Sequence, residues 1–180
     1  VAIGFKEIEV AFPSASETDF NFVRQLIDDK LIPNDVWIQV ITQSRPELIA
    51  KTFDALQGAS KAIVHLYNAT APVFREVVFN QDKASTIELA VNGAKLVKQH
   101  CEQNPNTQWQ FEYSPETFCF TEREFALKIC EAVKDVWQPT AKRPMIINLP
   151  ATVEMNTPNV YADQIEWFMG SSQKTEKIVR

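Results

Sequence analysis

One histidine stands where a parallel sheet would hold reactive groups. His65 lies inside the apolar stretch Lys61 to Tyr67 (KAIVHLY), close to its carboxyl end. An imidazole there can donate a hydrogen bond to a substrate oxygen, or it can be a core histidine held by a neighbouring backbone group. The sequence leaves both interpretations open. The second histidine, His100, stands near a predicted helix end, where its charge is favourable without any role in chemistry.

A serine and a carboxylate follow the next apolar stretch. Ser114 and Glu116 belong to the segment FEYSPE, in which Pro115 is predicted to stiffen a turn. Glu116 can act as a proton acceptor if partial burial raises its pKa toward neutrality. It can equally occupy the first turn of the following helix, where a carboxylate is stabilising. A general base and a helix start therefore stand as two hypotheses for Glu116.

A long loop rich in polar residues and proline follows the last complete predicted strand. It begins at Pro150 and continues through Thr152 to Pro158. Connections between a strand and a helix usually take about 2–6 residues, and longer ones tend to be functional. Thr152 can donate a hydrogen bond to a substrate carboxylate, or it can simply cap the loop.

The three cysteines, Cys101, Cys119 and Cys130, have no spacing typical of a metal site. An odd number also argues against a disulfide framework and fits a reducing cytoplasm. We interpret all three as small apolar residues.

Strand and helix patterns alternate along the chain, so the elements that position these residues can be predicted. Alternating or continuous apolar runs predict strands over 5–12, 36–42, 61–67, 107–113, 143–149 and 177–179. Between them, apolar residues at three- and four-residue spacing predict a helix that Ser16 or Thr18 caps and that runs to Ile27, and further helices over 46–56, 85–103, 121–136 and 160–169. This alternation predicts an α/β fold with parallel strands and right-handed crossovers.

Two architectures are compatible with this order, an open doubly wound sheet and a (β/α)8 TIM barrel. The first strand-to-helix turn, PSAS, lacks the glycine pattern of a dinucleotide-binding fold. Polar residues at the carboxyl ends of most strands favour the barrel, whose active sites lie at that end. Six strands, the last one cut short, cannot close a barrel of about 250 residues. The prediction is therefore a partial (β/α)8 barrel, with residues 1–180 forming one segment of a longer catalytic domain.

The composition excludes several classes of protein. With 18 Lys and Arg against 23 Asp and Glu, the net charge is −5, which argues against nucleic-acid binding. The apolar runs are far shorter than the ~18 residues that a membrane span needs, and the start shows no signal-peptide pattern. A hydrophobic fraction of 45% is enough for a packed core. These properties predict a globular, cytoplasmic protein.

Five motifs together closely resemble the catalytic barrel of the 2-isopropylmalate synthase family, especially its longer, second-type branch. The resemblance runs from about residue 3 to 169. It is carried by the strings GFKEIEVAFPSAS, IQVITQSRPELI, IVHLYN, FEYSPETF followed by TERE, and NLPATVEMNTPNVYADQIEWF.

The resemblance implies an acyltransferase that condenses acetyl-CoA with 2-oxoisovalerate to 2-isopropylmalate, the first committed step of leucine biosynthesis. It implies a homodimer and a divalent metal ion, Mg, Mn or Zn, in the complete enzyme. It makes His65, Ser114 and Thr152 contacts of the keto acid, and Glu116 a candidate for proton transfer from the acetyl methyl group.

The family's metal ligands are not expected within this chain. They form an Arg-Asp pair on the first strand and a His-x-His motif on the seventh, which would lie before residue 1 and after residue 180. The segment alone is therefore expected to hold no metal and to be inactive. Two alternatives remain: a catalytically silent barrel fragment, and part of a sister enzyme that makes citramalate or homocitrate.

Overall fold

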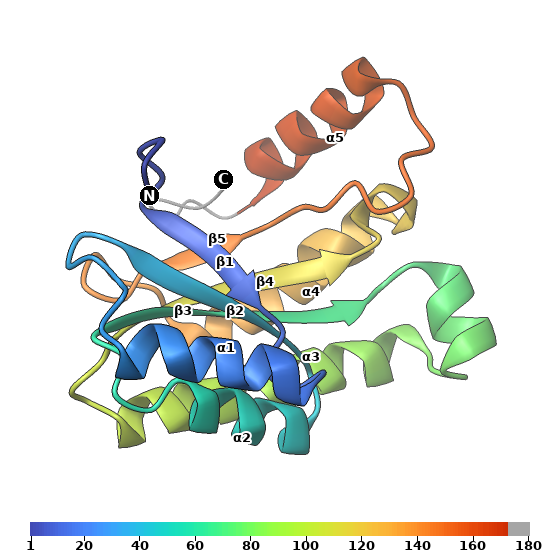
Figure 1. The fold of residues 1–180 in the computed structure, drawn as a ribbon. Helices are drawn as coiled ribbons and strands as arrows, with labels where there is room; N and C mark the ends of the chain where they lie inside the picture. The colour runs from blue at the N-terminus through green and yellow to red at the C-terminus, as the bar shows by residue number, and fades with distance from the viewer. Residues whose placement is uncertain (173–180) are drawn as a thin grey trace.

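A computed structural model describes residues 1–172 of the chain and contains one parallel sheet, with the first four α-helices packed against it and the last α-helix beside the fourth (Figure 1). The strands are β1 (Glu7–Ala11), β2 (Trp37–Gln43), β3 (Lys61–Ala69), β4 (Gln108–Glu116) and β5 (Met145–Ile147). The helices are α1 (Glu17–Asp28), α2 (Pro46–Ala55), α3 (Lys83–Gln103), α4 (Arg123–Trp137) and α5 (Pro158–Ser171). A π-helical turn, η1 (Val73–Val78), follows β3, and a 3-10 turn, η2 (Phe118–Phe120), follows β4.

The strands lie in chain order, β1-β2-β3-β4-β5, and every neighbouring pair is parallel. Helices α1 to α4 each contact the strand that precedes them, and α5 contacts α4. This sequential order confirms the predicted alternation of strand and helix and is the order of strands in a TIM barrel. The sheet is unclosed over residues 1–172, and the strand predicted over 177–179 lies outside the described residues.

The helices begin where the sequence supplies caps. The side chain of Ser16 accepts a hydrogen bond from the backbone N–H of Asp19 at the start of α1. Asp82 does the same for Ser85 at the start of α3. Proline occupies the first position of α2 and α5, where its missing N–H costs nothing.

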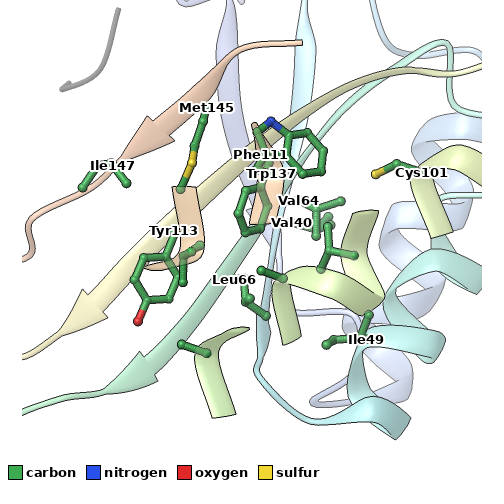
Figure 2. Close-up of a cluster of buried hydrophobic side chains, with 14 of the residues drawn as sticks. Val40, Ile49, Val64, Leu66, Cys101, Phe111, Tyr113, Trp137, Met145 and Ile147 are labelled. Atoms are coloured by element: carbon green, nitrogen blue, oxygen red, sulfur yellow. The ribbon is translucent and has the colours of Figure 1, made fainter. Parts of the chain in front are cut away.

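The two faces of the sheet have opposite chemistry. Figure 2 shows Val40, Val64, Leu66 and Phe111 in the buried cluster under the helices, and each is fully buried, with 0% of its surface exposed to solvent. Each such side chain contributes about 1.5–3 kcal/mol through burial. Successive residues of a strand point to opposite faces. The immediate neighbours of these four residues in their strands, such as His65 between Val64 and Leu66, therefore lie on the face without helices. That second face carries mostly polar side chains and is where the site forms.

Several boundaries differ from the prediction around β4. The strand continues to Glu116 instead of ending at residue 113, so Ser114 and Pro115 belong to the strand and not to a turn. Pro115 is tolerated because β5 already stops at Ile147, the partner of Tyr113. Helix α4 starts at Arg123, well beyond Glu116. The hypothesis that Glu116 occupies the first turn of a helix is therefore wrong.

Other boundaries shift for local reasons. β5 has three residues, where seven were predicted, because Arg143 pairs with Thr140 in a separate bridge and Pro150 follows soon after. The turn η1 was not predicted at all. None of the helices within residues 1–172 is long and apolar enough to cross a membrane.

One glycine sets how closely α3 approaches the end of β2. A Cβ atom built on Gly93 would lie 2.1 Å from Ser44 Oγ and 3.1 Å from Leu66 Cδ2. The Ser44 hydroxyl cannot turn away freely, because it donates to the Leu89 carbonyl at 2.7 Å. Only glycine fits at this crossing.

Replacement of Gly93 by alanine is expected to destabilise the chain by about 1–3 kcal/mol, because the added methyl group would overpack the close contact between α3 and Ser44. This corresponds to about 2–4 °C in Tm for each kcal/mol. Thermal unfolding of Gly93→Ala, Ser44→Ala and the double variant measures the effect. The double variant should recover much of the loss, since it removes the clashing oxygen, and a Gly93→Ala variant as stable as the unmutated chain would contradict the close packing.

Candidate functional site

The face of the sheet without helices carries a row of polar side chains that crosses the strands. Glu9 on β1 is paired in register with Gln39 on β2, and His65 on β3 is paired with Glu112 on β4. Ser114 and Glu116 lie two and four residues after Glu112, so all three side chains share one face of β4. The alternation of the strands therefore gathers the candidate residues on one side of the sheet.

His65 is the centre of this row. It is 6% exposed, and both of its ring nitrogens have partners. Its Nδ1 lies 2.7 Å from Glu9 Oε2, and its Nε2 lies 2.7 Å from Ser114 Oγ. The imidazole thus links β1 to β4 across the sheet, and neither nitrogen is left to a backbone group.

Two amides extend the chain of hydrogen bonds. Asn148, directly after β5, donates from Nδ2 to Ser114 Oγ at 2.8 Å. Its backbone N–H donates to the Tyr113 carbonyl, which fixes the residue beside β4. Gln39 donates to Glu9 Oε2 at 2.8 Å and lies 3.4 Å from His65 Nδ1. A continuous polar path therefore joins β1, β2, β3 and β4 to the residue that follows β5.

The two carboxylates next to His65 differ in protonation behaviour. Burial tends to raise the pKa of Glu9, but its hydrogen bonds with His65 and Gln39 outweigh burial and lower that pKa. Glu112 lies 3.5 Å from His65 Nε2, and there burial dominates and raises the pKa of the carboxyl group. Of the two, Glu9 therefore keeps its negative charge to lower pH, and Glu112 takes up a proton more readily.

The raised pKa of Glu112 predicts a stability that depends on pH. A folded state with a raised carboxyl pKa binds more protons than the unfolded state, so stability falls as pH rises above the ordinary pKa of 4.5. Glu112→Gln removes this loss. We therefore expect the Glu112→Gln chain to have a higher Tm than the unmutated chain at pH 8.

Thermal unfolding at several pH values checks this expectation. The gain from Glu112→Gln should shrink toward zero below about pH 4.5, where the carboxyl group is protonated in both states. Glu88→Gln, an exposed substitution on α3, is the matched control and should show no such trend. A Glu112→Gln chain that is less stable at pH 8 would show that the ionised carboxylate is stabilising.

Glu116 lies beside a separate cavity of about 240 Å³ at the carboxyl ends of β2, β3 and β4. Gln43 and Tyr67 line the same cavity, and Gln43 donates to the Tyr67 phenol oxygen at 2.9 Å. Burial raises the pKa of the Glu116 carboxyl group. A carboxylate with a raised pKa is a stronger base, so the environment of Glu116 suits a group that takes a proton.

Thr152 lies in the loop between β5 and α5 and is half-buried. Its backbone carbonyl accepts a hydrogen bond from Cys119 Sγ at 3.1 Å, which ties the loop to η2. Among the residues that the structure describes, a hydrogen bond joins His65 and Ser114 directly, Glu116 lines the neighbouring cavity, and Thr152 is tied to η2 instead.

Four residues of this polar row were not predicted from the sequence: Glu9, Gln39, Glu112 and Asn148. Each except Asn148 alternates with apolar neighbours inside a predicted strand, a pattern that also describes an ordinary solvent-facing strand residue. The sequence did contain an indication, since a polar residue stands between apolar neighbours in the middle of three predicted strands. The pairing register that turns this recurrence into contacts is absent from the sequence.

The second histidine and two of the cysteines contribute to packing. His100 falls in the last turn of α3, as predicted, and stacks on Phe53 at 4.7 Å. Cys101 and Cys130 belong to the buried hydrophobic cluster, which confirms their interpretation as apolar residues. Within residues 1–172, no three His, Cys, Asp or Glu side chains come together in a way that could hold a metal ion.

Comparison with known proteins identifies what the chain is similar to. A family model described as HMGL-like matches residues 1–179. The 2-isopropylmalate synthase of Marinomonas sp. is 65% identical over 178 residues, which are 99% of this chain and 32% of that protein. The synthase of Pseudomonas savastanoi pv. phaseolicola is 64% identical over 168 residues, 93% of this chain and 30% of that protein.

A third relative agrees with these two. The 2-isopropylmalate synthase of Pseudomonas fluorescens is 60% identical over 179 residues, again 99% of this chain and 32% of that protein. The chain spans about a third of the length of these relatives. The matches confirm the resemblance predicted from the motifs. HMGL-like proteins are TIM barrels, so the unclosed parallel sheet is the predicted partial barrel.

Proposed function

Because the chain belongs to the HMGL-like family, we propose that it supplies the keto-acid pocket and the proton acceptor of a condensing acyltransferase. The reaction joins acetyl-CoA and 2-oxoisovalerate, with water, to give 2-isopropylmalate and free CoA. One observation carries the proposal: the polar side chains gather on a single face, where His65, Ser114 and Glu116 come from adjacent strands. The relatives named 2-isopropylmalate synthase support the choice of product.

The keto acid is an anion with an adjacent carbonyl, so its pocket needs hydrogen-bond donors held in fixed positions. His65 and Ser114 form a buried pair at 2.7 Å, and Asn148 holds the serine from the other side. Such preorganised groups bind without losing much side-chain freedom. In this proposal the keto acid binds against His65 and Ser114, and the Ser114 O–H turns from His65 Nε2 to a keto-acid oxygen when the substrate is bound. The Thr152 hydroxyl donates to the carboxylate from its loop.

Glu116 takes the proton from the acetyl methyl group. The C–H bond breaks, the proton goes to a carboxylate oxygen, and the electron pair forms the enolate of the thioester. The enolate carbon then attacks the keto carbon, the electrons of the C=O bond move to its oxygen, and the resulting alkoxide takes up a proton that balances the one removed from the methyl group. Water then hydrolyses the thioester, breaking its C–S bond to give the carboxylate of 2-isopropylmalate and free CoA. The position of Glu116 beside a cavity, with its pKa raised by burial, supports this role.

Enzymes of the HMGL-like family generally depend on a metal ion. Residues 1–172 do not fit such an ion by themselves, since they bring no three suitable donors together. The roles proposed for this chain are therefore limited to binding the keto acid, orienting it and accepting a proton.

A thiol-release assay on the full-length protein tests the proposed function. With acetyl-CoA and a divalent metal ion present, 2-oxoisovalerate should be consumed with a higher kcat/KM than pyruvate or 2-oxoglutarate. A preference for pyruvate would favour a citramalate-forming enzyme, and a preference for 2-oxoglutarate would favour a homocitrate-forming one. The absence of thiol release with all three keto acids would favour a catalytically silent barrel.

A further inference from the structure

The carboxylate of Glu9 occupies a position for which the proposed reaction has no use, against the ring nitrogen of His65 that faces away from Ser114. We propose that Glu9 is a positioning residue that keeps the imidazole proton on Nδ1 and thereby turns the lone pair of Nε2 toward the Ser114 hydroxyl. The tautomer of His65 is independent of the proposed function, and only the expected effect on binding of the keto acid rests on it.

The geometry at Nδ1 defines which atom carries the proton. Glu9 Oε2 lies 2.7 Å from Nδ1, a hydrogen-bond distance. An ionised carboxylate can only accept, and the lowered pKa of Glu9 keeps it ionised at neutral pH. Nδ1 must therefore be the donor. Glu112, the other acid near the ring, lies 3.5 Å from Nε2 and so does not compete for the Nδ1 proton.

The tautomer determines the direction of the serine hydroxyl. With the proton on Nδ1, a neutral His65 can only accept at Nε2, so the Ser114 O–H must donate across the 2.7 Å contact. Asn148 Nδ2 meanwhile donates to the same serine oxygen at 2.8 Å. Ser114 then donates to one partner and accepts from the other, which fixes its hydroxyl in one orientation.

Gln39 shows what would happen without Glu9. Its Nε2 donates to Glu9 at 2.8 Å and is only 3.4 Å from His65 Nδ1. Once the carboxylate is removed, this amide can donate to Nδ1 instead. Nδ1 then becomes the acceptor, the proton moves to Nε2, and Nε2 donates to Ser114. The serine must rotate and would lose its fixed hydroxyl direction.

Nuclear magnetic resonance of the imidazole nitrogens tests the proposal directly. In the full-length protein, the nitrogen signals of His65 and His100 are assigned with the variants His65→Phe and His100→Phe, each of which removes one set of signals. Protonated and unprotonated ring nitrogens give distinct chemical shifts, so spectra recorded on the alkaline plateau of a pH series report the neutral tautomer. We expect the Nδ1–H form for His65 in the unmutated chain and the Nε2–H form in Glu9→Ala.

Two controls accompany the measurement. Gln39→Ala leaves the carboxylate in place, so His65 should keep its Nδ1–H form. The His100 signals should be the same in all variants, which shows that the fold is intact; the Glu9 side chain is 42% exposed, so its truncation leaves little unfilled space. An Nε2–H form of His65 in the unmutated chain, or an Nδ1–H form retained in Glu9→Ala, would overturn the proposal.

Kinetics of the full-length protein separate this proposal from the proposed function. If Ser114 contacts the keto acid, Glu9→Ala should raise the KM for 2-oxoisovalerate by about tenfold, the scale of one hydrogen bond, with kcat changed less. A tautomer that changes without any change in KM would support Glu9 as the positioning residue and would count against Ser114 as a contact of the keto acid.

Discussion

Replacement of Glu116 by glutamine in the full-length protein is expected to lower kcat by about 10²–10⁴-fold, the usual contribution of a general acid or base. Glutamine keeps the size of the side chain and a hydrogen-bonding end but cannot take a proton. The KM for 2-oxoisovalerate should change little, since the keto acid is held by other residues. Thiol release at saturating metal and substrate measures both quantities.

The pH profile gives a second test of the same variant. Burial raises the pKa of Glu116, and a base works only when it is deprotonated. The rate of the unmutated enzyme should therefore fall on the acid side at a pH above the ordinary value of 4.5 for a carboxyl group. In Glu116→Gln the residual rate should lose this acid limb.

A matched control distinguishes lost chemistry from a disturbed fold. Glu88→Gln removes an exposed carboxylate on α3 and should leave kcat and Tm unchanged. If Glu116→Gln raises KM at constant kcat, Glu116 binds substrate without serving as a base. A kcat within about threefold of the unmutated enzyme would remove Glu116 from the chemistry.

The fold was largely predictable because parallel sheets leave a strong pattern in sequence. Strands such as β3 are covered by helices on one face and are rich in β-branched and apolar residues, while the helices show three- and four-residue spacing. Proline and capping residues marked the starts of α1 and α2. The order of elements then restricted the topology to very few possibilities.

The errors arose where a local signal competes with tertiary pairing. Pro115 is a turn residue by propensity, yet β4 passes through it because the pairing with β3 extends from Lys61 to Ala69. The turn η1 was missed because π-helical segments have no distinctive periodicity at six residues. In both places, contacts with other elements determine the structure.

The site was predictable in part. The positions of His65 and Ser114 followed from the strand ends and the family motifs, but their direct contact is diagonal, because His65 pairs with Glu112, two residues before Ser114. The role of Glu9 depends on the pairing of β1 with β2, 30 residues apart in the chain. Such partners are visible only once the strands are aligned.

His65→Phe should have the next largest effect, about 10–100-fold in kcat/KM and mainly through a higher KM for 2-oxoisovalerate. Phenylalanine keeps an aromatic ring of similar size but has no ring nitrogens. Ser114 then loses its 2.7 Å partner, and Glu9 keeps only Gln39. Hydrogen bonds that involve charged groups contribute about 1.5–3 kcal/mol, which sets the expected loss.

The substitution His100→Phe is the control, because this second histidine stacks on Phe53 near the end of α3, away from the polar face. It should leave kcat and KM unchanged. A His65→Phe enzyme that loses kcat and keeps its KM would mean that His65 acts in the transition state, where the proposal has it binding the keto acid. If both constants stay within about threefold, the buried pair of His65 and Ser114 is a structural link between strands, and the keto acid must be held by residues outside this row.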